Sequence, residues 1–132
     1  MKMKYESAAG EMFGNPSDDM LDRLLEEIDG DENSYAYLTA KQGNYIQVGG
    51  GPKEFTVEIR VTAKDGTFQH FKATHPKGGT AKKKVTVGGQ TVNIRANQVL
   101  DLKTVQELFR AFSNTGKASP TINWEDITAM FL

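Results

Sequence analysis

Residues 99–116, VLDLKTVQELFRAFSNTG, predict an amphipathic helix with both ends defined by the sequence. Asp101 is a good N-cap, because its carboxylate can accept a hydrogen bond from the first turn. Gly116 stands where a C-cap glycine is expected, since glycine adopts a positive φ without strain. The apolar residues between these ends recur at helical spacing and form one stripe: Leu102, Val105, Leu108, Phe109 and Phe112. Such a stripe must pack on an apolar surface, and the strand-rich middle of the chain offers one.

The residues after this helix predict a short extended segment. Pro120 stops any helix, and residues 121–124 then read as a strand or an extended segment. Trp124, the one tryptophan of the chain, is expected to pack in the core or at its rim, where its indole N–H needs an acceptor. The residue types in this C-terminal region predict packing rather than catalysis.

Between residues 34 and 95 the apolar period changes from helical to alternating. The clearest case is residues 55–63, where Phe55, Val57 and Ile59 point to one face and the polar residues between them point to the other. This alternation indicates a strand with one buried and one exposed face. Glycine-containing turns, such as the one at Asp65, separate the strands. The expected strands are 35–40, 45–48, 55–63, 67–74, 85–87 and 90–95.

A second helix is predicted near the N-terminus. Asn15 or Ser17 can cap it, and its apolar stripe runs to Ile28. Residues 1–14 before it could form an arm or a strand. The order of elements predicts one α+β domain, residues 1–132, with an antiparallel meandering sheet of about six strands. The N-terminal and C-terminal helices are expected to cover the apolar face of that sheet.

The composition excludes several classes of site. The chain has no cysteine, so disulfides, thiolate metal sites and cysteine nucleophiles are ruled out. Its first residues lack the apolar run of a signal peptide, and no window approaches the roughly 20 apolar residues of a membrane span. We therefore expect a cytoplasmic protein that does not contact a membrane.

The net charge of −1 conceals two blocks of opposite sign. Residues 1–32 hold ten acids and three bases, a net charge of −7. Residues 33–97 hold ten bases and three acids, a net charge of +7. Two interpretations are open at this stage. The blocks could neutralise each other within the fold, or the acidic block could present one face to a basic partner.

The acidic helix and the loop after it form the most suggestive surface in the sequence. A dense set of carboxylates favours fast, salt-sensitive association with a basic protein. The alternative is an ordinary solvated helix face. The predicted partner-binding residues are Asp18, Asp19, Asp22, Glu26, Asp29, Asp31 and Glu32.

Other motifs favour structural interpretations. Residues 49–53, GGGPK, lack the helix start of a phosphate loop and predict a hairpin turn. The lysines at 82–84 have no aromatic residues between them, so they indicate a solvated loop before a strand. His70 and His75 lack metal-ligand spacing and a paired nucleophile, so both are expected at surface or half-buried positions, with no catalytic, metal or cofactor site. An enzymatic or ligand-binding alternative places His70 and Glu58 in one cleft.

The order of these features resembles the Imm-one type immunity proteins of bacterial polymorphic toxin systems. A leucine-rich helix leads through Asp-Gly into a strand over residues 21–38, and a glycine-rich hairpin follows. A helix then ends in Phe-x-x-x-Gly at residues 112–116, before Pro-x-x-x-Trp-Glu at residues 120–125. The resemblance covers most of residues 17–125, and its strongest part is the C-terminal helix and the segment after it.

The resemblance implies a cytoplasmic protein that is not an enzyme and needs no cofactor. Members of this family bind and neutralise the C-terminal domain of a toxin, often a nucleic-acid-modifying domain of the deaminase or nuclease type. The expected partner is thus a protein, with no direct contact to nucleic acid. The residues of the C-terminal signature, Phe109, Phe112, Gly116 and Trp124, are assigned to the fold. A secretion-accessory interaction module is a further alternative, and an exposed edge strand could pair two copies as a homodimer.

Overall fold

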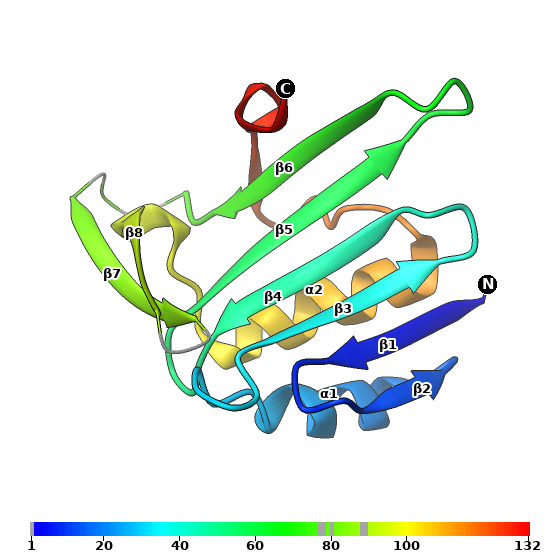
Figure 1. Ribbon diagram of the computed structural model, residues 1–132, viewed down its shortest axis with the longest axis horizontal. Coiled ribbons are helices and arrows are strands. Elements are labelled where there is room, and N and C mark those ends of the chain that lie inside the picture. The colour runs from blue at the N-terminus through cyan, green and yellow to red at the C-terminus, as the bar shows by residue number, and fades with distance from the viewer. Residues whose placement is uncertain (1, 77–78, 80, 88–89) are drawn as a thin grey trace.

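The computed structural model describes residues 2–76, 79, 81–87 and 90–132, which form an α+β fold around a seven-stranded sheet (Figure 1). The strands lie in the order β2-β1-β3-β4-β5-β6-β9, and each neighbouring pair is antiparallel. Their bounds are Met3–Ser7 for β1, Met12–Gly14 for β2, Tyr35–Ala40 for β3, Tyr45–Gly50 for β4, Phe55–Thr62 for β5, Phe68–Thr74 for β6 and Asn123–Asp126 for β9. A separate two-stranded sheet pairs β7 (Lys82–Val87) with β8 (Gln90–Arg95).

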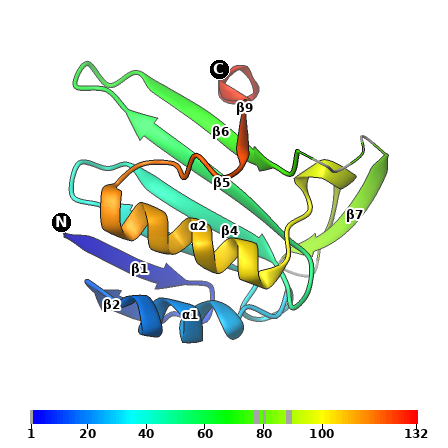
Figure 2. The ribbon, with the colours of Figure 1, turned by 180° about the vertical axis from the view of Figure 1, so that it is seen from behind.

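Two helices, α1 (Asp18–Glu26) and α2 (Leu102–Thr115), cover one face of the large sheet (Figure 2). Their apolar stripes are buried against the inward-facing residues of the strands, as the periodicity predicted. The buried helical residues are Leu21, Leu24, Leu25, Val105, Leu108, Phe109 and Phe112. Among the described residues, no α-helix lies on the other face of the sheet, and a short 3-10 helix, η2 (Thr128–Phe131), lies beside the β6 edge (Figure 1).

The predicted α+β class, with an antiparallel sheet and two helices, is confirmed, but the membership of the sheet differs. The N-terminal segment forms β1 and β2 and extends one edge. The expected strands near residues 85–95 form the separate hairpin, whose predicted Gly88-Gly89 turn lies outside the described residues. One reason is that β9 already pairs with the free edge of β6. The lysines at 82–84, predicted to lie in a loop, instead form the first half of β7, so that prediction was wrong. This polar sequence has little apolar surface to bury in a layered sheet.

The ends of both helices follow local sequence rules. Asp101 Oδ1 accepts a hydrogen bond from the Thr104 N–H at 2.8 Å, and Gly116 closes α2 with a φ of 72°. Ser17 caps α1 by accepting from the Met20 N–H at 3.2 Å. Asn15, the other candidate cap, instead accepts a hydrogen bond from the Met3 N–H at 2.9 Å. This bond links the segment before α1 to the first residue of β1.

Asp101→Ala should lower the free energy of unfolding by about 1 kcal/mol at neutral pH, because α2 loses its N-cap. Hydrogen bonds from the side chain and backbone of Thr104 hold the pKa of Asp101 below its ordinary value of 3.8. A carboxyl with a lowered folded-state pKa stabilises the fold above its unfolded pKa, and this contribution is lost as the pH falls through the lowered value. Urea unfolding of the native chain and of Asp101→Ala should therefore be compared at neutral pH and near pH 2. The difference between their free energies of unfolding should be smaller in acid. Asp101→Asn, which retains a cap, is the control; equal losses in both variants would contradict the capping role.

The glycine-rich segment after β4 is a hairpin turn, as predicted. It joins β4 to β5, and the Gly51 N–H donates to the Glu54 carbonyl at 2.8 Å. A strand follows the turn, so the segment does not present the helix N-terminus that a phosphate loop requires.

Candidate functional site

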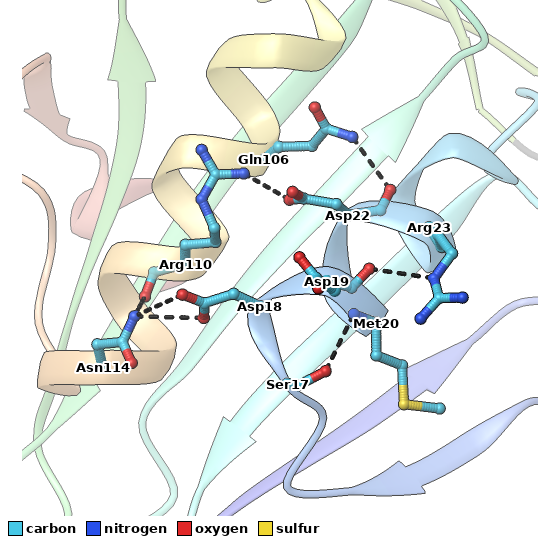
Figure 3. Close-up of polar contacts among 9 residues, drawn as sticks. All are labelled: Ser17, Asp18, Asp19, Met20, Asp22, Arg23, Gln106, Arg110 and Asn114. Atoms are coloured by element: carbon cyan, nitrogen blue, oxygen red, sulfur yellow. Dashed lines mark hydrogen bonds and ion pairs between the residues drawn. The ribbon is translucent and has the colours of Figure 1, made fainter.

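Two of the seven predicted partner-binding carboxylates face α2 (Figure 3). Arg110 Nη1 lies 2.5 Å from Asp22 Oδ1, and Gln106 Nε2 donates to the Asp22 carbonyl at 3.0 Å. Asn114 Nδ2 donates to Asp18 Oδ1 at 3.3 Å, one turn further along the same helix pair (Figure 3). Asp18 and Asp22 therefore join the two helices, and only part of their hydrogen-bonding capacity faces solvent.

Asp29 has a structural task in the loop after α1. Its Oδ1 accepts the N–H groups of Asp31 at 2.9 Å and Asn33 at 3.0 Å. These two backbone hydrogen bonds lower the pKa of Asp29, since they favour the charged carboxylate. Asn33 in turn donates to the Glu27 carbonyl at 3.0 Å. These hydrogen bonds hold the backbone of the loop in one shape.

The other four predicted carboxylates, Asp19, Glu26, Asp31 and Glu32, are exposed. Within the described part of the chain, their side chains make no hydrogen bond or ion pair. We call these four residues the acidic surface. They lie along α1 and its loop, at the side of the molecule formed by β1 and β2 (Figure 1).

Sequence reasoning left two neighbouring carboxylates, Glu11 and Glu27, out of the predicted set. Partial burial raises the pKa of Glu11, and the negative charge of Glu27 nearby raises it further. Glu27 could have been included, because it lies on the solvent face of the predicted helix. Glu11 could not, because its position depends on the turn between β1 and β2. Both extend the negative charge beside the acidic surface.

The acidic block is not neutralised through ion pairs by the basic middle of the chain. Five pairs of oppositely charged or titratable side chains approach within ion-pair distance among the described residues, and none joins residues 1–32 to residues 33–97. Among the described residues, the acidic block's one ion pair with a base outside itself is the contact between Asp22 and Arg110. The four outward carboxylates therefore keep their charge available to a partner.

His70 and Glu58, the alternative functional pair, meet on the helix-free face of the sheet. Antiparallel pairing places His70 beside Arg60, and His70 Nε2 lies 2.6 Å from Glu58 Oε1. The Arg60 Nε–H donates to His70 Nδ1 at 3.0 Å. Because the guanidinium can only donate, Nδ1 must be an acceptor, and a neutral imidazole then carries its proton on Nε2, facing the carboxylate.

The surroundings of His70 favour a structural pair over a catalytic one. His70 is only 1 % exposed, so the expectation of a surface or half-buried histidine was wrong. The Phe131 ring lies 4.3 Å from the imidazole, centroid to centroid, and Tyr45 lies at 6.2 Å. A groove on this face is lined by Glu58 but not by His70. Both nitrogens of His70 are occupied, which leaves no open position for a substrate proton.

Other functional signals are limited. The described residues contain no group of three or more His, Cys, Asp or Glu that could hold a metal ion. Within the same residues, no helix has the length and apolar character needed to span a bilayer. A scan against protein-family models and a search of curated proteins find no match to the chain. The resemblance to the Imm-one type proteins therefore stays a prediction from the sequence.

Proposed function

We propose that this protein is an immunity protein of the Imm-one type, which binds and neutralises a cognate toxin domain in the cytoplasm. The observation that carries this proposal is the acidic surface, whose four carboxylates point outward without partners in the described fold. Two packed helices and a hydrogen-bonded loop support the backbone that carries these charges.

Electrostatic complementarity explains why such a surface suits a toxin that acts on nucleic acid. A protein that binds nucleic acid needs lysines and arginines to hold the phosphates. An acidic surface competes for the same positive charges and speeds the encounter between the two proteins. In this account the immunity protein needs no chemistry of its own, because occupying or covering the basic surface is enough.

Growth rescue tests this function. The toxin domain encoded beside this chain's gene is expressed with and without the chain, and the pair is then run on a sizing column. We expect growth to be restored and the two proteins to elute together. Toxicity that persists despite soluble expression of both chains, with separate elution, would contradict the proposal.

Reversing the charges of the acidic surface should slow association with the toxin domain. In the variant Asp19→Lys, Glu26→Lys, Asp31→Lys, Glu32→Lys, we expect the association rate constant to fall by about 10- to 100-fold at low salt, with a weaker salt dependence. Stopped-flow fluorescence measures both quantities. Asp18, Asp22 and Asp29 are left unchanged, because their loss would also disturb the helix pair or the loop.

A single-residue pair provides the matched control. Glu26 and Glu107 are both exposed helical glutamates, and neither makes a hydrogen bond or ion pair with a described residue. Glu26→Lys should slow association and Glu107→Lys should not. Equal rates for all variants would show that the toxin does not bind at the acidic surface.

A further inference from the structure

A groove of about 730 Å³ lies on the helix-free side of the molecule, away from α1. Residues of the hairpin of β7 and β8 line one wall, and residues of the C-terminal segment that contains η2 line the other. Figure 1 shows where these two elements lie in the fold. Glu58 of β5, Lys72 of β6 and Glu125 of β9 line the groove between the two walls. Its volume is in the range of sites that bind small molecules or short peptide segments.

The hairpin wall is basic because of the pairing register. Lys82 lies opposite Arg95, and Lys84 lies opposite Asn93, so these four residues share one face of the hairpin. All four line the groove. Lys83 points to the other face, where its Nζ lies 2.8 Å from Glu54 Oε2. The lysine run is thus divided by strand alternation into two groove lysines and one lysine outside the groove.

The opposite wall is apolar and exposed. It contains Ile127, Met130 and Phe131, and the side chains of Met130 and Phe131 are 77 % and 46 % exposed. Phe131 is held in place from below by His70 and by Arg60, whose guanidinium carbon lies 4.9 Å from the ring centroid. Adjacent exposed apolar side chains of this size often mark binding sites.

The charges of the groove leave a surplus of unpaired cations. Glu58 already accepts from His70, and Glu125 already pairs with Arg95. The ammonium groups of Lys82 and Lys84 make no ion pair with any residue that the structure describes. A ligand that carries negative charge towards the hairpin and apolar groups towards η2 would complement both walls.

We propose that this groove binds an extended peptide segment of a partner protein in which acidic and large apolar residues alternate. Lys82 and Lys84 are two residues apart on one strand, a separation of roughly 6.6 Å, and alternate side chains of an extended peptide have the same spacing. Acidic side chains on one side of such a peptide meet the two lysines, and the intervening apolar side chains meet Met130 and Phe131. Recognition of extended peptides by alternating pockets is a common use of strand geometry.

The test uses the purified full chain and a fluorescein-labelled peptide of alternating aspartate and leucine. Fluorescence anisotropy should show saturable binding. A peptide of the same composition, with all aspartates before all leucines, should bind about tenfold more weakly or worse. Equal affinity for both peptides, or no saturable binding of the alternating one, would overturn the proposal.

Variants of the lysine run locate the binding. The double variant Lys82→Gln, Lys84→Gln should bind the alternating peptide about tenfold more weakly than the native chain does. Met130→Ser should also lower the affinity for this peptide. Lys83→Gln is the matched control, since it removes an adjacent charge on the other face of the hairpin, and it should bind like the native chain. Circular dichroism checks that each variant is folded. Equal weakening by Lys83→Gln would indicate general charge attraction and contradict a specific groove.

Competition between inorganic triphosphate and the labelled peptide is a second test. Triphosphate should compete weakly, because it cannot contact the apolar wall. Displacement of the peptide by triphosphate at lower concentration than by unlabelled peptide would identify a phosphate site and overturn the peptide proposal. These measurements need no toxin, so their failure would leave the proposed immunity function standing.

Discussion

Replacing Phe109 by alanine is expected to lower the free energy of unfolding by about 3–5 kcal/mol. The Phe109 side chain is 0 % exposed and lies midway along the apolar stripe of α2. Truncation removes its burial and leaves a cavity between the helix and the sheet, which the neighbouring side chains fill only in part. Urea unfolding should show a lower midpoint with an unchanged slope.

Leu102 is the matched control for this prediction. It belongs to the same stripe, but it lies in the first turn and is only partly buried. Leu102→Ala should therefore lower the free energy of unfolding by less than Phe109→Ala, because it removes fewer buried apolar atoms. Equal losses at the two positions would show that α2 is not anchored through its centre, contrary to the fold described above.

The substitution Gly51→Ala should cost about 2–4 kcal/mol, the second-largest effect that we expect from one residue. A Cβ at Gly51 would lie 2.4 Å from the Ile28 carbonyl oxygen and 2.9 Å from its carbon. Gly51 also has a φ of +98°, which side-chain-bearing residues rarely adopt. The turn after β4 must therefore move away from Ile28, which follows α1, or its backbone must change conformation.

Gly43→Ala separates the two causes. Gly43 has a nearly identical φ of +96°, but a Cβ there would meet nothing within 4 Å. Gly43→Ala should therefore introduce backbone strain but no close contact. Thermal unfolding should show that its free energy of unfolding falls by less, about 1–2 kcal/mol. If the two variants were equally stable, close packing of Gly51 against Ile28 would not be what requires glycine.

Much of the fold could be predicted because local signals were strong. Both helices, the two ends of α2 and the central strands follow from periodicity and capping residues. Trp124 lies at the rim of the core, half-buried, and its Nε1–H donates to the Ser119 carbonyl at 2.8 Å. Trp124→Ala should accordingly lower the free energy of unfolding by less than Phe109→Ala does. The separate hairpin could not be predicted, since it depends on β9 taking the edge of β6.

The candidate site shows the same division between local and long-range information. The acidic character of α1 could be predicted from the sequence alone. The contact of Asp22 with Arg110 joins residues far apart in the chain, so the sequence could not show that Asp22 serves the fold. The burial of His70 likewise depends on Phe131, which returns over the sheet from the C-terminal segment.

Stoichiometric inhibition tests whether this chain neutralises a toxin domain. The purified chain is titrated into the purified toxin domain while the toxin's activity on its nucleic-acid substrate is followed. We expect the toxin's activity to disappear near equimolar protein at low salt. The variant with all four carboxylates of the acidic surface reversed should need a large excess. Full toxin activity in the presence of excess native chain would contradict the proposed immunity function.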